Sequence, residues 1–153
     1  MRMPMLFAGH GSPMNAIENN AFTREWQRIG KALPTPKAIL SVSAHWYTAG
    51  TLVSDVWENR TIYDMYGFPD ALYRVAYPAK GAPELAARTR ALLTPDARLS
   101  GEWGLDHGTW SVLTHMFPKA DIPVFQLSVN RRRPRRSILP WGRRCALCGR
   151  KVC

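Results

Sequence analysis

The alternation of hydrophobic and polar positions along the chain predicts helices interleaved with short strands. From residue 21 to residue 33, apolar side chains recur with the roughly 3.6-residue period of an α-helix, and Pro34 ends that pattern. Elsewhere, mostly apolar runs bounded by turn-forming residues predict strands. The strands are expected at 5–8, 38–43, 51–56 and 122–129, and two further helices at 83–93 and 109–117.

Strands that alternate with helices are typical of the α/β class. We expect a three-layer sandwich, in which helices cover both faces of a central, mostly parallel or mixed sheet. The stretch 57–80 is rich in aromatic and turn-forming residues, so we expect it to form a long structured loop with one helical turn. A chain of 153 residues without an internal repeat is expected to hold one globular domain.

The composition of the chain changes sharply after residue 130. Residues 1–130 carry 12 basic and 11 acidic side chains, whereas residues 131–153 carry nine basic side chains and no acidic one. A whole-chain net charge of +10 would suggest a nucleic-acid partner, but that value averages two unlike segments. We therefore expect an enzyme domain at 1–130 and a basic tail at 131–153. The tail also holds all three cysteines: Cys145, Cys148 and Cys153.

The tail lacks the hydrophobic periodicity from which a core is built. Its arginine, proline, glycine, cysteine and tryptophan content favours the out-of-frame translation of a GC-rich gene. A zinc- or nucleic-acid-binding element is the alternative, because Cys145 and Cys148 form a Cys-x-x-Cys pair and the arginine run could contact phosphates. Structural zinc prefers four ligands, and no fourth one is apparent nearby. An unstructured tail without a specific role is the third interpretation.

Membrane insertion and secretion are not expected. No run of about 20 apolar residues is present, as a membrane-spanning helix requires. The apolar run near the N-terminus is too short for a secretory signal. Residues 1–130 contain no cysteine, so the predicted domain needs no disulfide framework. We expect a cytoplasmic protein, and the sequence predicts no particular oligomeric state.

Three of the four histidines occupy similar places in the predicted fold. His10 and His45 each follow a predicted strand, and His107 lies in the loop before a predicted helix. If the first two strands are parallel neighbours, His10 and His45 emerge together at the carboxyl edge, where open α/β sheets bind ligands. Imidazole pairs suit iron(II), zinc or copper. The pattern predicts a metal site, with ordinary loop histidines held by backbone hydrogen bonds as the alternative.

The remaining polar candidates show weaker signs of a catalytic or metal-binding role. His115 falls on the predicted solvent side of its helix. Asp106 either orients a neighbouring imidazole or caps the following helix. Ser12 follows a Gly-His-Gly turn, but the chain lacks the Gly-x-Ser-x-Gly elbow, so serine hydrolysis is disfavoured. The common phosphate-binding glycine loops are absent from the sequence as well.

Four short motifs follow one another in order within residues 5–129. They are GHGSPMN at 9–15, SAHW at 43–46, GFP at 67–69 and WGLDHGTW at 103–110. In order and spacing they resemble the class III extradiol ring-cleavage dioxygenases, and most closely the bacterial DOPA 4,5-dioxygenase-like branch of that family.

The resemblance implies a non-haem metal, iron(II) in active enzymes and often zinc in isolated ones. In the family this metal binds a catechol-type, DOPA-like diol through both hydroxyls together with O2, and the ring is cut beside the diol. The resemblance implies that His10 and His45 are metal ligands. It implies that His107 contacts the substrate or the bound oxygen rather than the metal. A small aromatic diol and O2 are thus the expected partners, and nucleic acid is not.

The chain departs from the family in its length. The family domain is nearly twice as long, and its second half supplies an acid/base histidine and a further metal ligand. In this sequence no histidine follows His115. We therefore expect a truncated sheet with open edges, and no catalytic turnover by these 153 residues alone.

Overall fold

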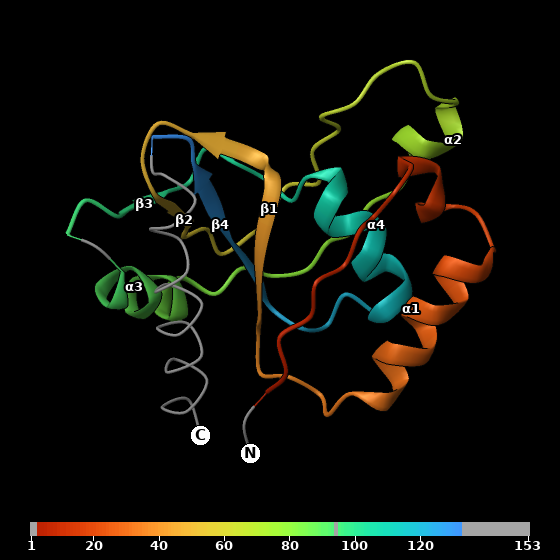
Figure 1. Ribbon diagram of the computed structural model, residues 1–153, viewed down its shortest axis with the longest axis horizontal. Helices are drawn as coiled ribbons and strands as arrows, with labels where there is room; N and C mark the ends of the chain where they lie inside the picture. Colours follow the sequence, from red (N-terminus) through yellow and green to blue (C-terminus); the bar gives the residue numbers. More distant parts are fainter. Residues whose placement is uncertain (1–2, 94, 133–153) are drawn as a thin grey trace.

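The computed structural model describes residues 3–93 and 95–132 (Figure 1). The predictions for the tail, including the Cys-x-x-Cys pair, fall almost entirely outside the described residues. In chain order the described elements are the 3-10 helix η1 (Pro13–Ala16), α1 (Ala21–Ala32), β1 (Ile39–Thr48), β2 (Leu52–Ser54), α2 (Asp70–Tyr73), α3 (Pro83–Leu92), β3 (Arg98–Ser100), α4 (His107–Met116) and β4 (Val124–Asn130).

The four strands form one open, mixed sheet in the order β1-β4-β2-β3. β1 runs parallel to β4, β2 runs parallel to β3, and β2 and β4 meet in antiparallel orientation at Val53 and Leu127. β4 lies between β1 and β2 in the sheet, and nearly all of its side chains are buried. A strand buried on both faces is expected where helices cover both sides of a sheet.

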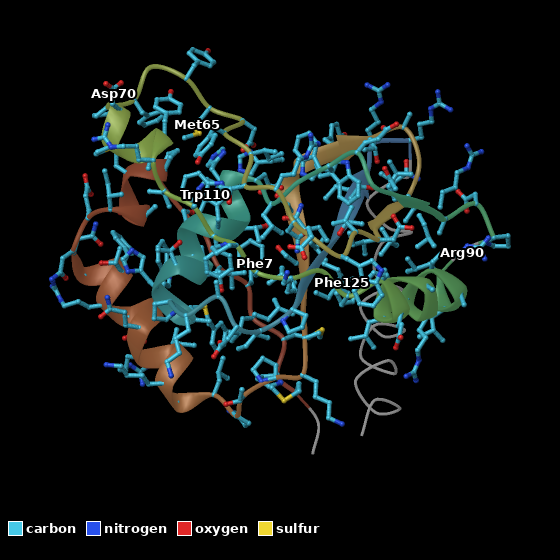
Figure 2. The ribbon with its side chains drawn as sticks, turned by 180° about the vertical axis from the view of Figure 1, so that it is seen from behind. Phe7, Met65, Asp70, Arg90, Trp110 and Phe125 are labelled. Atoms are coloured by element: carbon cyan, nitrogen blue, oxygen red, sulfur yellow. The ribbon has the colours of Figure 1, made fainter. Side chains whose placement is uncertain are left out.

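Helices lie on both faces of this sheet. Figure 1 shows α3 on one side, and α4 with α1 outside it on the other. Consecutive residues of β4 point to opposite faces, as the pleat of a strand requires. Val124 belongs to the apolar cluster with Trp110 of α4, and Phe125 to the cluster with Ala86 of α3, and Figure 2 shows Trp110 and Phe125 beside their respective helices. The predicted three-layer α/β architecture is confirmed.

The strand predicted at 5–8 is wrong. Residues 3–11 form neither helix nor strand, Met5 is 70% exposed and Phe7 is fully exposed. An apolar run becomes a strand only where another strand offers it a hydrogen-bonded ladder, and within the described residues no strand pairs with this segment. The apolar pattern was therefore present in the sequence, but its pairing partner is absent from the described sheet.

Other element boundaries also differ from the predictions. β1 continues five residues beyond its predicted end at residue 43, so His45 lies inside the strand rather than after it. Ser43 pairs with Ser128 and Tyr47 pairs with Val129, and residues 44–46 therefore bulge out of the ladder. The prediction missed η1 and β3, which are four and three residues long, because such short elements leave little periodicity to detect. The single helical turn expected within residues 57–80 is present as α2.

In the first turn of α1, the N-terminal cap rather than the apolar periodicity determines which side chains are buried. Asn20 accepts hydrogen bonds from the backbone N–H groups of Phe22 and Thr23, and the Thr23 hydroxyl accepts one from the backbone N–H of Asn20. This capping box places Thr23 in the interior and leaves the side chain of Phe22 68% exposed. Trp26 is buried, as the periodicity predicts.

The described helices are all short, and none has the length and apolar character that a membrane crossing needs.

Candidate metal centre

The structure brings His10, His45 and His107 together. One ring nitrogen of each lies within 4.8 Å of the others. The Nε2 atoms of His10 and His45 are 2.9 Å apart. The ring centroids of His45 and His107 are 4.0 Å apart, and that of His10 lies 4.9 Å from that of His107. The predicted juxtaposition is therefore present, although it arises from a loop, a strand and a helix rather than from two parallel strands.

His10 is held by the loop that leads into η1. Gly11 adopts a positive φ of 63°, which a glycine accepts without strain and which turns the chain sharply after His10. The side-chain amide of Asn15 donates to the carbonyl oxygen of His10 at 2.9 Å. Ser12 accepts a hydrogen bond from the backbone N–H of Met14 and so caps η1. The hydroxyl of Ser12 thus has a structural role beside the site.

His45 sits in the bulge of β1. Its backbone N–H donates to the hydroxyl oxygen of Ser43 at 3.2 Å, and that hydroxyl donates to Oδ1 of Asp106 at 2.8 Å. Gly108 lies directly under the imidazole, since a Cβ at this position would come 2.6 Å from Cδ2 of His45. The glycine therefore leaves the space that the His45 ring fills.

His107 is the first residue of α4 and is only 5% exposed. The helix starts here, two residues before the predicted start, because Asp106 accepts a hydrogen bond from the backbone N–H of Thr109 and caps it. The backbone N–H and ring Nδ1 of His107 both lie 2.9 Å from Oδ1 of Asp64. Helix capping and a carboxylate thus fix both the backbone and the ring of His107.

Asp106 acts as a buried structural carboxylate. It is fully buried and accepts hydrogen bonds from Ser43 and from the backbone of Thr109. Its second oxygen lies 3.0 Å from the indole nitrogen of Trp103 and 3.1 Å from the side-chain nitrogen of Gln126. Of the two roles considered for Asp106, the structure shows helix capping, and its link to His45 runs through Ser43 to the backbone N–H rather than to the ring.

Asp64 is the site residue that sequence reasoning missed. Its Oδ1 contacts His107, and its Oδ2 lies 3.4 Å from Nδ1 of His45. The side chain is 16% exposed. Asp64 comes from the loop 57–80, where neither periodicity nor a metal-ligand spacing singles it out. Its chemistry is visible only once the fold brings the loop against the N-terminus of α4.

The histidine cluster shifts two protonation equilibria. Burial lowers the pKa of His10 below its ordinary value of 6.5, and the neighbouring His107 and His45 lower it further. Burial alone would raise the pKa of Asp64, but hydrogen bonds from the ring and backbone of His107 outweigh it and hold the pKa below 3.8. At neutral pH the site therefore combines a neutral His10 imidazole with an ionised Asp64 carboxylate.

Acidification is expected to destabilise the metal-free chain in two steps. A folded-state pKa below that of the unfolded state means that unfolding takes up protons, so stability falls as the pH falls. For His10 the loss begins below about pH 6.5, and for Asp64 below about pH 3.8. Urea unfolding in the presence of a chelator should show a smaller loss between pH 7.5 and 5.5 for His10→Gln than for the parent chain. Equal losses would contradict the assignment to His10.

The donor atoms fit a bound metal ion. Neutral imidazole is the commonest metal ligand, and two such ligands at right angles and at about 2.1 Å from an ion lie about 3 Å apart. The Nε2 atoms of His10 and His45 have close to that separation. Nδ1 of His10 is buried, and within the described residues it has no hydrogen-bond partner. The site therefore combines imidazole nitrogens close enough to share an ion with one further ring nitrogen, Nδ1 of His10, that no described residue satisfies.

The expectation that His115 is a solvated surface residue is wrong. Its Nε2 lies 2.7 Å from the carbonyl oxygen of Asn15, its Nδ1 lies 3.4 Å from the side-chain nitrogen of Gln27, and its ring packs near Trp26. Ser111, four residues earlier on the same side of α4, is fully buried. The reason is that α4 is covered by α1 and η1 on one side and by the sheet on the other.

Residues 4–140 match the family described as the catalytic LigB subunit of aromatic ring-opening dioxygenase. The chain belongs to the LigB family. The resemblance to extradiol dioxygenases is thereby confirmed, and two relatives that are each named 4,5-DOPA dioxygenase extradiol confirm its DOPA-like branch. The LigB match extends ten residues past the change in composition at residue 130. The out-of-frame origin of the tail remains a prediction.

Named relatives support the same assignment of this LigB chain. It is 52% identical over 147 residues to a 4,5-DOPA dioxygenase extradiol of Escherichia coli K12, a match that covers 95% of the chain and 54% of the relative. It is 46% identical over 131 residues to a 4,5-DOPA dioxygenase extradiol of Beta vulgaris, covering 80% of the chain and 48% of the relative.

A solved structure shares the fold. The crystal structure of an uncharacterized protein from Escherichia coli K12 superposes with a TM-score of 0.74 at 43% sequence identity, covering 92% of this chain and 53% of that one. The LigB chain therefore spans about half the length of the relatives that it matches.

Proposed function

We propose that residues 1–130 form the metal-binding half of a non-haem extradiol dioxygenase that opens the ring of a catechol-type, DOPA-like diol with O2. The observation that carries the proposal is the convergence of His10, His45 and His107, since their ring nitrogens lie within 4.8 Å of one another. Membership of an aromatic ring-opening family and the names of the relatives support the reaction class.

In this proposal His10 and His45 hold the metal, with iron(II) as the working ion and zinc as an alternative occupant. The lowered pKa of His10 favours the neutral imidazole that binds a metal at neutral pH. Bound there, iron(II) would lower the pKa of a catechol hydroxyl and bring the diol and O2 together. Two imidazoles leave the other coordination positions for further ligands and for the reactants.

His107 is proposed to act on the substrate rather than on the metal. Its Nδ1 is engaged by Asp64 at 2.9 Å, so Nε2 is the ring nitrogen left to accept a proton from a substrate hydroxyl. The Asp64 carboxylate would stabilise the imidazolium that results. Burial of His107 beside the other two rings keeps this proton transfer away from bulk water.

Metal titration of the full 153-residue chain tests the proposal. The three tail cysteines are first replaced by serine, so that their thiolates do not bind zinc. We expect calorimetric binding of about one zinc ion per chain, and we expect His10→Ala combined with His45→Ala to abolish it, because the ion loses both proposed ligands. His115→Gln is the matched control, since this histidine lies outside the cluster.

Two outcomes would contradict the proposal. In the first, the parent chain binds no zinc in the cysteine-free background although its circular dichroism shows a folded protein. In the second, the double variant binds zinc as tightly as the His115→Gln control.

A further inference from the structure

Asp64 contacts two of the three clustered histidines at once. Oδ1 lies 2.9 Å from Nδ1 of His107, and Oδ2 lies 3.4 Å from Nδ1 of His45. An ionised carboxylate only accepts hydrogen bonds. His107, whose Nδ1 lies at hydrogen-bond distance, must therefore carry its proton on Nδ1 and keep the lone pair of the neutral ring on Nε2. The ion-pair distance from Oδ2 to Nδ1 of His45 favours the same tautomer in that ring.

We propose that Asp64 is a positioning residue that sets the tautomers of His45 and His107 together, so that both rings keep an Nε2 lone pair for the site. This inference deepens the proposed function and rests on it. A neutral imidazole can bind a metal or accept a proton only through its unprotonated nitrogen. One carboxylate would thus prepare His45 as a ligand and His107 as a proton acceptor.

The geometry of the His10 contact is consistent with this arrangement. Nε2 of His45 lies 2.9 Å from Nε2 of His10. If the His45 atom carries a lone pair, the His10 atom can donate a proton to it in the metal-free chain, which leaves Nδ1 of His10 as an acceptor. That Nδ1 is buried, and among the described residues it has no hydrogen-bond partner. The proton positions on the three rings are then mutually consistent, and they follow from the contacts that Asp64 makes.

Replacing Asp64 with asparagine separates positioning from a general structural role. The amide oxygen is expected to take the place of Oδ1, because two N–H groups of His107 donate there. The amide NH2 then faces Nδ1 of His45 and donates to it. His107 should therefore keep its Nδ1–H tautomer, whereas His45 should change to Nε2–H and lose the lone pair that faces His10.

The experiment records long-range nitrogen–proton NMR spectra of the labelled, metal-free chain at pH 8, with each ring assigned by single His→Gln variants. In the parent chain we expect both His45 and His107 as Nδ1–H. In Asp64→Asn only His45 should change, and in Asp64→Ala neither ring should retain the preference. Asp70→Asn, at an exposed aspartate, is the control and should change neither.

Zinc affinity in the cysteine-free background supplies a second measurement. Asp64→Asn and Asp64→Ala should each weaken binding by about 10- to 100-fold, as the loss of a partner that orients a metal-bound histidine typically does. The inference is overturned if His45 keeps the same tautomer in Asp64→Asn, or if zinc affinity is unchanged. If the parent chain itself binds no zinc, the proposed function fails, whereas the tautomer spectra still test the role of Asp64.

Discussion

Replacing Gly108 with alanine is expected to weaken zinc binding by about 10- to 100-fold while the fold is retained. The added Cβ would lie 2.6 Å from Cδ2 and 3.0 Å from Nε2 of His45. These distances are well inside van der Waals contact, so the His45 imidazole must move by several tenths of an ångström or more. Because Nε2 is the proposed donor atom, this displacement acts directly on the metal site.

Gly108→Ala is expected to change the free energy of unfolding of the metal-free chain only slightly. Alanine is favoured over glycine in a helix by roughly 0.5–1 kcal/mol, and the atoms crowded by the new methyl group belong to side chains. Urea unfolding of the metal-free variant should therefore show little loss. Gly9→Ala is the matched control beside His10, because a Cβ at Gly9 would meet no atom within 4 Å. Equal zinc affinities for the two variants would contradict the prediction.

Replacing Gly81 with alanine is expected to destabilise the chain by about 3 kcal/mol or more, the upper range for overpacking. The added Cβ would lie 1.7 Å from the carbonyl oxygen of Val56. The adjacent backbone is fixed, since the N–H of Gly81 donates to the carbonyl oxygen of Trp57 at 2.8 Å. Two backbone segments must therefore separate, because a rotamer change cannot relieve the clash.

Gly101→Ala provides the control for Gly81→Ala. Its Cβ would approach the same residue, Val56, but at 3.5 Å from the side-chain Cγ1, which is an ordinary contact. Urea or thermal unfolding should show a large loss for Gly81→Ala and a change within about 0.5 kcal/mol for Gly101→Ala. Similar unfolding midpoints for both variants would show that the loop adapts to the clash.

The sequence predicted the histidine cluster from its local surroundings. His10 and His45 were predicted to meet because each follows an apolar run predicted to be a strand, and the structure brings their Nε2 atoms to 2.9 Å from each other. The assumed route was incorrect, since residues 5–8 form no strand. The two rings meet because the loop before η1 and the bulge of β1 both reach the N-terminus of α4.

The residues that orient the cluster could not be predicted from the sequence. Asp64 contacts a histidine 43 positions away in the chain, and it lies in a loop whose sequence carries no period. The partial burial of His115 likewise depends on α1 and η1 covering the outer side of α4. Helix and strand patterns report which face of an element is apolar, but they do not report which polar groups distant loops bring to it.

The bulge in β1 has a consequence for how this site can change. Residues 44–46 have no opposing residues in β4, and the ladder resumes beyond them. Side chains alternate between the two faces only while a ladder is regular, so the direction of His45 is determined within the bulge rather than by the strand as a whole. Insertions or deletions there can re-aim the imidazole while the paired residues on either side keep their register. A change confined to the bulge can thus alter the chemistry of the site while the strand pairing of the sheet stays the same.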